Sequence, residues 1–104
     1  MAKATPVDGT DGELEGYMVR CPGCGDHHLF STEHANSVGA RWSFNGDSER
    51  PTFSPSMLVR SEVWDGNATR KDVCHSFVRD GRIQFLGDCT HELAGKTVPL
   101  PDID

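Results

Sequence analysis

The segment that most constrains the fold of this chain is residues 21–25, with the sequence CPGCG. It places two thiols two residues apart on a turn made sharp by glycine, an arrangement that can hold a metal ion from one side. The other two cysteines, Cys74 and Cys89, each have a histidine close by, His75 and His91. Four ligands suffice for tetrahedral zinc, so the sequence predicts a metal site built from distant segments.

Composition limits the other possibilities. The chain has 104 residues, 11 glycines and 6 prolines, which favour one small domain of turns and short strands over long helices. Its net charge of −6 repels phosphate backbones, so nucleic-acid binding by a zinc ribbon is disfavoured. It has no apolar run long enough to cross a bilayer, and residues 1–6 lack the apolar stretch of a secretory signal. We therefore expect a cytoplasmic protein, in the host cell if a phage encodes it, where thiols stay reduced and bind metal.

The expected fold class is small and mostly β, a zinc-ribbon-like set of hairpins with one short C-terminal helix. Residues 1–13 are polar and are expected to be flexible, and residues 14–104 are expected to form a single zinc-binding domain. Strands at 17–20 and 28–31 would flank the cysteine turn and put it at a hairpin tip, where only His28 of the nearby histidines could point inward. Residues 41–44 read as a further short strand, and an apolar stretch follows at 53–59.

A second hairpin is predicted around Asp80-Gly81, a pair suited to a two-residue turn with positive φ. Counting outward from the turn pairs Arg79 with Arg82, Phe77 with Gln84, and His75 with Leu86. Adjacent residues of a strand point to opposite faces, so Cys74 and His75 are not expected to hold the same ion. One of these two residues is expected to be a metal ligand.

Two segments beside this hairpin also bear on function. Residues 88–95 are predicted to form a helical turn or two, with Asp88 as its N-cap and with its carboxylate able to orient His91. Residues 61–72 are polar and are expected to be a flexible loop that could cover the site. An exposed Trp64 in that loop would indicate a surface for a partner.

Several motifs together resemble a known family. They are CPGCG at 21–25, WSFNGD at 42–47, RPTFSPS at 50–56, CHSFV at 74–78 and DCTHELAG at 88–95. This set, which covers roughly residues 17–102, resembles a family of small phage and prophage zinc-binding proteins that often carry the label "ammonia monooxygenase". The label itself says nothing about activity.

A more distant similarity concerns zinc-dependent peptidases encoded beside bacterial ubiquitin-like conjugation genes. It implies that Cys21, Cys24 and His75 are metal ligands and that Pro55-Ser56 lies beside the site. Those relatives carry a cysteine three positions before the histidine, where this chain has Asp72. The fourth ligand expected here is therefore Cys89, ahead of Cys74 and His91.

The similarity favours a zinc-dependent hydrolase, a peptidase that acts on the tail of a ubiquitin-like protein or another peptide. In that interpretation Cys21, Cys24 and His75 would hold zinc and a water, while His91, oriented by Asp88, moves the proton. A hydroxyl of Ser54 or Ser56 would face the developing oxyanion. Each residue also has a plainer role, in packing, capping or a turn.

The alternative function is a phage-encoded binding or adaptor module without catalysis, in which a closed zinc site only stabilises the fold. On cysteine spacing alone the closed site is the commoner case. The number of protein ligands separates the two hypotheses, since three plus water favour chemistry and four favour a structural role. The sequence leaves the oligomeric state and the identity of the substrate open.

Overall fold

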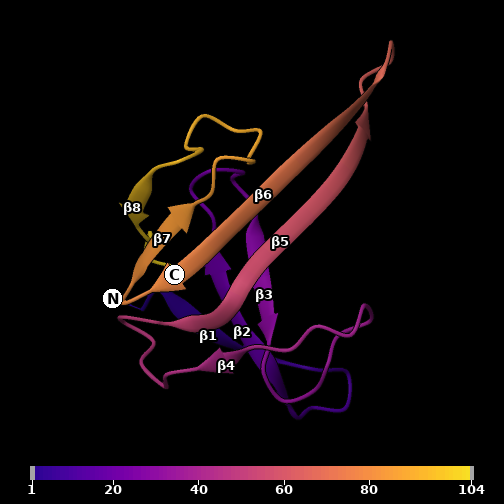
Figure 1. Ribbon diagram of the computed structural model, residues 1–104. Coiled ribbons are helices and arrows are strands. Elements are labelled where there is room, and N and C mark those ends of the chain that lie inside the picture. The colour runs from indigo at the N-terminus through magenta and orange to yellow at the C-terminus, as the bar shows by residue number, and fades with distance from the viewer. Residues whose placement is uncertain (1, 104) are drawn as a thin grey trace.

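The computed structural model describes residues 2–103, which form eight strands in two antiparallel sheets and contain no helix (Figure 1). The first sheet has the order β1-β2-β3, with bounds Ala4–Asp8, Leu14–Arg20 and His27–Ser31. The second has the order β4-β5-β6-β7-β8, with bounds Ser43–Phe44, Phe53–Trp64, Thr69–Arg79, Arg82–Phe85 and Thr97–Pro99. The mostly-β prediction is therefore confirmed, and the predicted helix is absent from residues 2–103.

The hairpin of β2 and β3 carries the cysteine turn at its tip, as the sequence predicted. Val19 lies opposite His28 and Arg20 opposite His27, and the Cys21 amide then donates to the carbonyl of Asp26 at 2.8 Å. Gly25 has a φ of 79°, which an L side chain rarely adopts, and its amide closes the turn on the Cys21 carbonyl. We call residues 21–26 the knuckle.

The hairpin of β6 and β7 is also confirmed in its register. Asp80 and Gly81 have φ of 50° and 76°, as a two-residue turn of this kind requires. The observed strand pairs include Arg79 with Arg82 and Phe77 with Gln84, and the Leu86 amide donates to the His75 carbonyl. The turn residues therefore determined which residues of β6 share a face.

Aromatic side chains join the two sheets in the core. Phe30 of β3 stacks on Phe53 of β5 with ring centroids 4.2 Å apart, and Phe44 stacks on the same ring at 4.8 Å. Trp42 meets Phe30 edge-on and is buried. Aromatic contacts of this kind bury large apolar areas, so they hold the knuckle hairpin against β5.

Part of the segment 1–13, which is expected to be flexible, forms a strand, and Met1 lies outside the residues that the structure describes. Residues Ala4–Asp8 form β1, which pairs with β2 from Ala4 opposite Val19 onward. Lys3 is tied to Asp102 by an ion pair of 2.7 Å, and the Ala4 side chain is buried. From Thr5 to Asp8 the positions alternate between half-buried and exposed, as they do in a strand with one face towards the core.

Residues 88–95 form turns where a helix was expected. The reason is that the first residues of this segment bond to β6: the Thr90 amide donates to the Val73 carbonyl at 3.0 Å, and Cys89 bonds to the backbone of His75. Asp88 faces His75, so it does not act as a cap.

No part of residues 2–103 forms a helix with the length and hydropathy of a membrane span.

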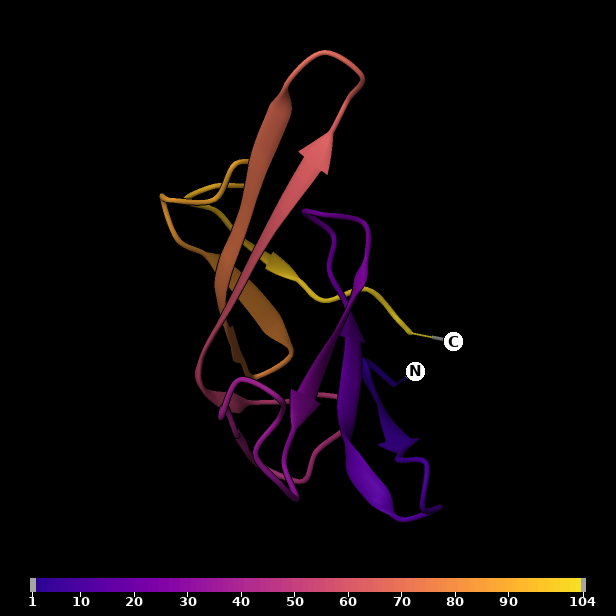
Figure 2. The ribbon, with the colours of Figure 1, turned by 90° about the vertical axis from the view of Figure 1, so that its right-hand side faces the viewer.

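The polar stretch 61–72 is also ordered differently from the flexible loop expected. Strands β5 and β6 continue through it as a two-stranded arm, and only residues 65–68 form the turn, where Asp65 accepts from the amides of Asn67 and Ala68. Figures 1 and 2 show this arm extending beyond the rest of the molecule. Both faces of its outer part meet water, which explains the polar sequence.

Candidate active site and metal centre

Four thiol and imidazole groups converge where the knuckle meets β6. They are Cys21, Cys24, His28 and Cys74, whose ligand atoms all lie within 4.8 Å of one another. Cys21, His28 and Cys74 are buried, and Cys24 is exposed. This cluster could bind a metal ion such as zinc, with one side open towards solvent.

The distances within the cluster fit a tetrahedral zinc site. The sulfurs of Cys21 and Cys74 are 3.7 Å apart, and the Nε2 atom of His28 lies 3.3 Å from the sulfur of Cys24 and 3.7 Å from that of Cys74. With Zn–S bonds of about 2.3 Å and a Zn–N bond of about 2.0–2.1 Å, tetrahedral geometry separates two sulfurs by about 3.8 Å and a sulfur from a nitrogen by about 3.6 Å. The side chains are therefore already spaced as ligands of one ion.

The two buried thiols also share a proton in a way that suits a cation. The hydrogen bond between the two sulfurs lowers the pKa of Cys21. The pKa of Cys74 is raised, first by that hydrogen bond and then by burial. A positively charged ion between the sulfurs would stabilise both thiolates and release the shared proton.

The sequence indicated part of this cluster and missed part. Cys21 and Cys24 were predicted as ligands, and His28 was recognised as the one histidine of its group able to point inward. As the fourth ligand, the sequence favours Cys89 over Cys74. Cys74 reaches the knuckle because it lies on the inner face of β6, opposite Val59 of β5.

Cys74 belongs to a second group as well, together with Cys89 and His91. Here the Cys89 thiol donates to the His75 carbonyl and accepts from the His75 amide, both at 3.2 Å. The His91 ring packs edge-on against Phe85 and lies where a side chain on Gly23 would be. Its Nδ1 accepts from the Leu93 amide at 3.2 Å. This group has three donors and the first has four, so the first suits zinc better.

Cys89→Ala therefore tests the ligand set. We expect this variant to keep one metal ion per chain and Cys74→Ala to lose it. Of these two cysteines, only Cys74 belongs to the four-donor cluster. Elemental analysis of the purified variants measures this directly. Loss of metal from Cys89→Ala with retention in a Cys24→Ala control would assign the ion to the second group.

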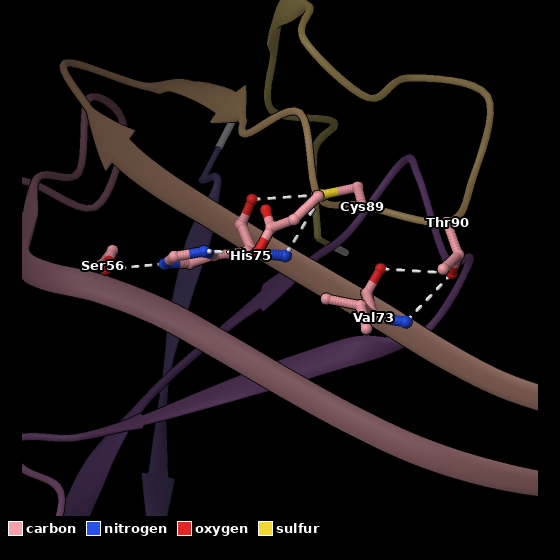
Figure 3. A network of polar contacts seen from close by, with 6 residues as sticks. Ser56, Val73, His75, Cys89 and Thr90 are labelled. Carbon is pink, nitrogen blue, oxygen red and sulfur yellow. Dashed lines mark hydrogen bonds and ion pairs between the residues drawn. The ribbon is translucent and has the colours of Figure 1, made fainter.

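A different set of residues meets on the opposite face of β6. The Nε2 atom of His75 lies 3.2 Å from the hydroxyl of Ser56, and its Nδ1 atom lies 3.1 Å from a carboxylate oxygen of Asp88. Figure 3 shows Ser56 and His75 facing each other across β5 and β6. The order Ser–His–Asp, with one imidazole nitrogen for each partner, is that of a catalytic triad.

The carboxylate of Asp88 determines how the imidazole can act. An ionised carboxylate only accepts hydrogen bonds, so the Nδ1 atom of His75 carries the proton when it bonds to Asp88. The Nε2 atom is then free to accept from the Ser56 hydroxyl. The side chain of His75 is 24% exposed and that of Asp88 is 55% exposed, so a substrate can approach this pair from solvent.

An irregularity of β5 presents Ser56. The pairs Phe53–Val78 and Met57–Ser76 are both formed, so residues 54–56 lie opposite Phe77 alone. The Ser56 carbonyl accepts from the Trp42 indole at 3.3 Å, which holds the end of this bulge. Ser54 is exposed and its carbonyl bonds to Ser43, so of the two serines predicted beside the site Ser56 is the one that reaches His75.

The segment that carries Asp88 is fastened to β6 by its next two residues (Figure 3). Cys89 bonds to both backbone groups of His75, and Thr90 bonds through its hydroxyl to both backbone groups of Val73, at 3.0 and 3.3 Å. The side chains of Cys89 and Thr90 thus satisfy backbone groups of β6 that a neighbouring strand would otherwise pair with. Asp88 and His75 are thereby kept at hydrogen-bond distance although 13 residues separate them.

The predicted site residues are therefore divided between two places. Cys21 and Cys24 lie in the metal cluster, while His75 and Cys89, predicted as further ligands, lie with Ser56 and Asp88. His91, predicted to work with Asp88, instead bonds to the Leu93 amide. Two adjacent residues of β6 thus belong to different clusters, Cys74 on one face and His75 on the other.

The model of one protein family matches residues 2–86, which is most of the chain, and it describes the bacterial ubiquitination-like system serine protease BubE. The chain belongs to the BubE family. Comparison with curated proteins and with solved structures gave no match.

Membership of the BubE family supports one part of the expectation from sequence. The sequence predicted a peptidase linked to a ubiquitin-like system, and the family is one of proteases from ubiquitination-like systems. A protease of this kind acts on a protein substrate. The family is described by serine chemistry, which differs from the zinc-dependent peptidase that the sequence suggested. The matched range includes Ser56 and His75 and ends two residues before Asp88.

Proposed function

We propose that this chain is a serine peptidase that cleaves the tail of a ubiquitin-like protein, with Ser56 as nucleophile, His75 as general base and Asp88 as the group that orients His75. The observation that carries the proposal is the continuous chain of contacts from Ser56 through His75 to Asp88, at 3.2 and 3.1 Å. The BubE family supplies the substrate class, since its description places a serine protease in a ubiquitination-like system.

Each residue has a defined step in this mechanism. The Nε2 atom of His75 takes the proton of the Ser56 hydroxyl as its oxygen attacks the scissile carbonyl. His75 then gives that proton to the leaving amine, which departs and leaves an ester on Ser56. Water, deprotonated by His75, hydrolyses the ester and regenerates the hydroxyl. Asp88 stabilises the charged imidazole each time it forms.

We assign the metal cluster a structural role, with Zn²⁺ as the ion that suits its donors. Three sulfurs and one imidazole complete a tetrahedral set without water, which is the arrangement of a site that stabilises a fold. Cys74 is buried on the inner face of β6, whereas His75 lies on the other face with Ser56. The proposal therefore combines a structural zinc site, as in the adaptor hypothesis, with a separate catalytic site on the other face of β6. A cytoplasmic location, where thiols stay reduced, suits the metal site.

Asp88→Asn is expected to lower kcat by about a hundredfold or more, because an amide can donate to the Nδ1 atom of His75 and so favours the tautomer that cannot accept from Ser56. The measurement is cleavage of the ubiquitin-like protein under saturating substrate. Asp80→Asn serves as a matched control, since Asp80 is an exposed turn residue outside the site. Equal activity of the two variants would remove Asp88 from the mechanism.

The experiment that tests the proposed function uses a fluorophosphonate probe and a protein substrate. The probe should label the purified chain at one position, which peptide mass spectrometry should identify as Ser56. The chain should also release a reporter fused to the C-terminus of the ubiquitin-like protein from the same bacterial system. A strong metal chelator present only during a short assay should leave this release unchanged. Inhibition by the chelator before any unfolding would instead favour a zinc-dependent peptidase.

A further inference from the structure

The outer part of β5 has an edge that no other strand covers. β4 pairs with β5 only at Phe53 and Ser54, and within residues 2–103 no strand lies beside β5 from Met57 to its end at Trp64 on this side. Leu58, Arg60 and Glu62 are exposed along this stretch. Long uncovered edges invite pairing with another chain, so proteins usually cover or interrupt them.

The hydrogen bonds of β6 show which backbone groups of β5 are free. Val73 and His75 direct their N–H and C=O groups away from β5, to Thr90, Cys89 and Leu86. Because backbone groups alternate in direction along an antiparallel pair, Cys74 faces β5 and bonds with its partner there, Val59.

The residues between the bonded ones on β5 therefore point their backbone groups outward. These are Leu58, Arg60 and Glu62, whose amides and carbonyls have no hydrogen-bond partner among the described residues. The Ser56 carbonyl points the same way and accepts from Trp42. The open edge thus begins two residues after the nucleophile.

We infer that this edge binds the substrate, by pairing with an extended segment of the tail next to the scissile bond as an added β-strand. The inference rests on the proposed function and names how that site recognises its substrate. His75 reaches Ser56 from β6, on one side of β5, and the free edge lies on the other side. A peptide paired with Leu58, Arg60 and Glu62 would therefore run towards Ser56 from the side that the base leaves open.

Side chains of such a peptide would have distinct surroundings on its two faces. On the inner face a groove of about 650 Å³ separates the arm from the knuckle, and its lining includes Val59, Val63 and His27. On the outer face the peptide would meet Leu58, which is 42% exposed and lies opposite His75. Main-chain pairing of this kind gives affinity, and the alternate side chains give specificity.

The first test removes one outward amide. Arg60→Pro deletes the N–H that would bond to the peptide, at a position that makes no hydrogen bond to β6, and Arg60→Ala is the matched control that keeps it. We expect Arg60→Pro to lower kcat/KM for the reporter fusion by about tenfold or more, and Arg60→Ala by less than about threefold. Labelling of Ser56 by the fluorophosphonate should change by less than about twofold in both, because the probe needs no paired edge. Equal kcat/KM for the two variants would overturn the inference.

The second test keeps the protein unmodified, so it does not depend on the folding of a variant. Semisynthetic substrates carry one N-methyl amide each at successive positions of the tail beside the cleaved bond. Strand pairing predicts that kcat/KM falls at every second position and is nearly unchanged between them. A loss without this two-residue period would overturn edge pairing even if the tail is cleaved.

Two further outcomes would count against substrate pairing at this edge. If the wild-type chain is labelled at Ser56 but does not cleave the fusion, the proposed substrate is wrong. The inference about the edge is then wrong as well. Sedimentation that shows a stable wild-type dimer, which Arg60→Pro converts to monomer, would assign the edge to a second copy of the chain. A monomer in both proteins together with the alternating pattern supports substrate pairing.

Discussion

Ser56→Ala is expected to lower kcat for cleavage of the ubiquitin-like fusion by at least about a thousandfold, since removal of the nucleophile leaves only the weak catalysis that binding provides. The hydroxyl is the one group of β5 within hydrogen-bond distance of the Nε2 atom of His75. Its loss should also abolish labelling by the fluorophosphonate, while the thermal midpoint stays close to that of the wild type, because Ser56 is only half-buried.

Ser54→Ala is the control for this result. Ser54 lies two residues earlier in the same bulge, but it is exposed and makes no hydrogen bond to His75. This variant should retain activity within about threefold and should still be labelled. Loss of cleavage in Ser54→Ala with retention in Ser56→Ala would reverse the assignment of the nucleophile.

Loss of the metal is expected to produce the second large effect, this time on stability. Cys21→Ser should release the ion and lower the thermal midpoint by about 15 °C or more, since structural zinc contributes several kcal/mol to the folding of small domains. Cys21 is completely buried where the knuckle meets β6, and an ion there would join the first sheet to the second. Differential scanning calorimetry on metal-loaded protein measures the shift.

A chelator provides the independent control for the metal. Prolonged treatment of the wild-type chain should lower its midpoint by about the same amount, and the same treatment should leave Cys21→Ser unchanged because that variant has no ion to lose. Added zinc should restore the midpoint of the chelator-treated wild type and leave that of Cys21→Ser where it was. A wild-type melt that a strong chelator does not move would rule out a role for metal in folding.

The local elements of this fold could be predicted because they depend on neighbouring residues. The sequence CPGCG required a tight turn, and Asp80-Gly81 required positive φ, so both hairpins and the register of the second followed from a few residues. β1 and the arm of β5 and β6 were not predicted. Their strands are held by pairing with distant segments, and their polar sequences resemble loops.

The positions of Cys74 and His75 illustrate the same limit for the site. Strand alternation predicted correctly that adjacent residues would serve different faces, and therefore that only one of them would face the knuckle. The sequence does not say which face of β6 packs on the knuckle. The resemblance to zinc-dependent peptidases favoured His75 as the ligand, whereas in the structure the inner face carries Cys74.

By itself the sequence determined the cysteine knuckle and the second hairpin, because short turn motifs encode their own geometry. The link to ubiquitin-like systems came from the resemblance of its motifs to known proteins. Only the tertiary structure decided that Ser56, His75 and Asp88 meet in one line, since they come from β5, β6 and the segment after β7. No spacing between them is fixed by local chemistry. Pairing of β5 with β6, the bond of Trp42 to the Ser56 carbonyl, and the bonds of Cys89 and Thr90 to β6 set the distances on which the proposed catalysis depends.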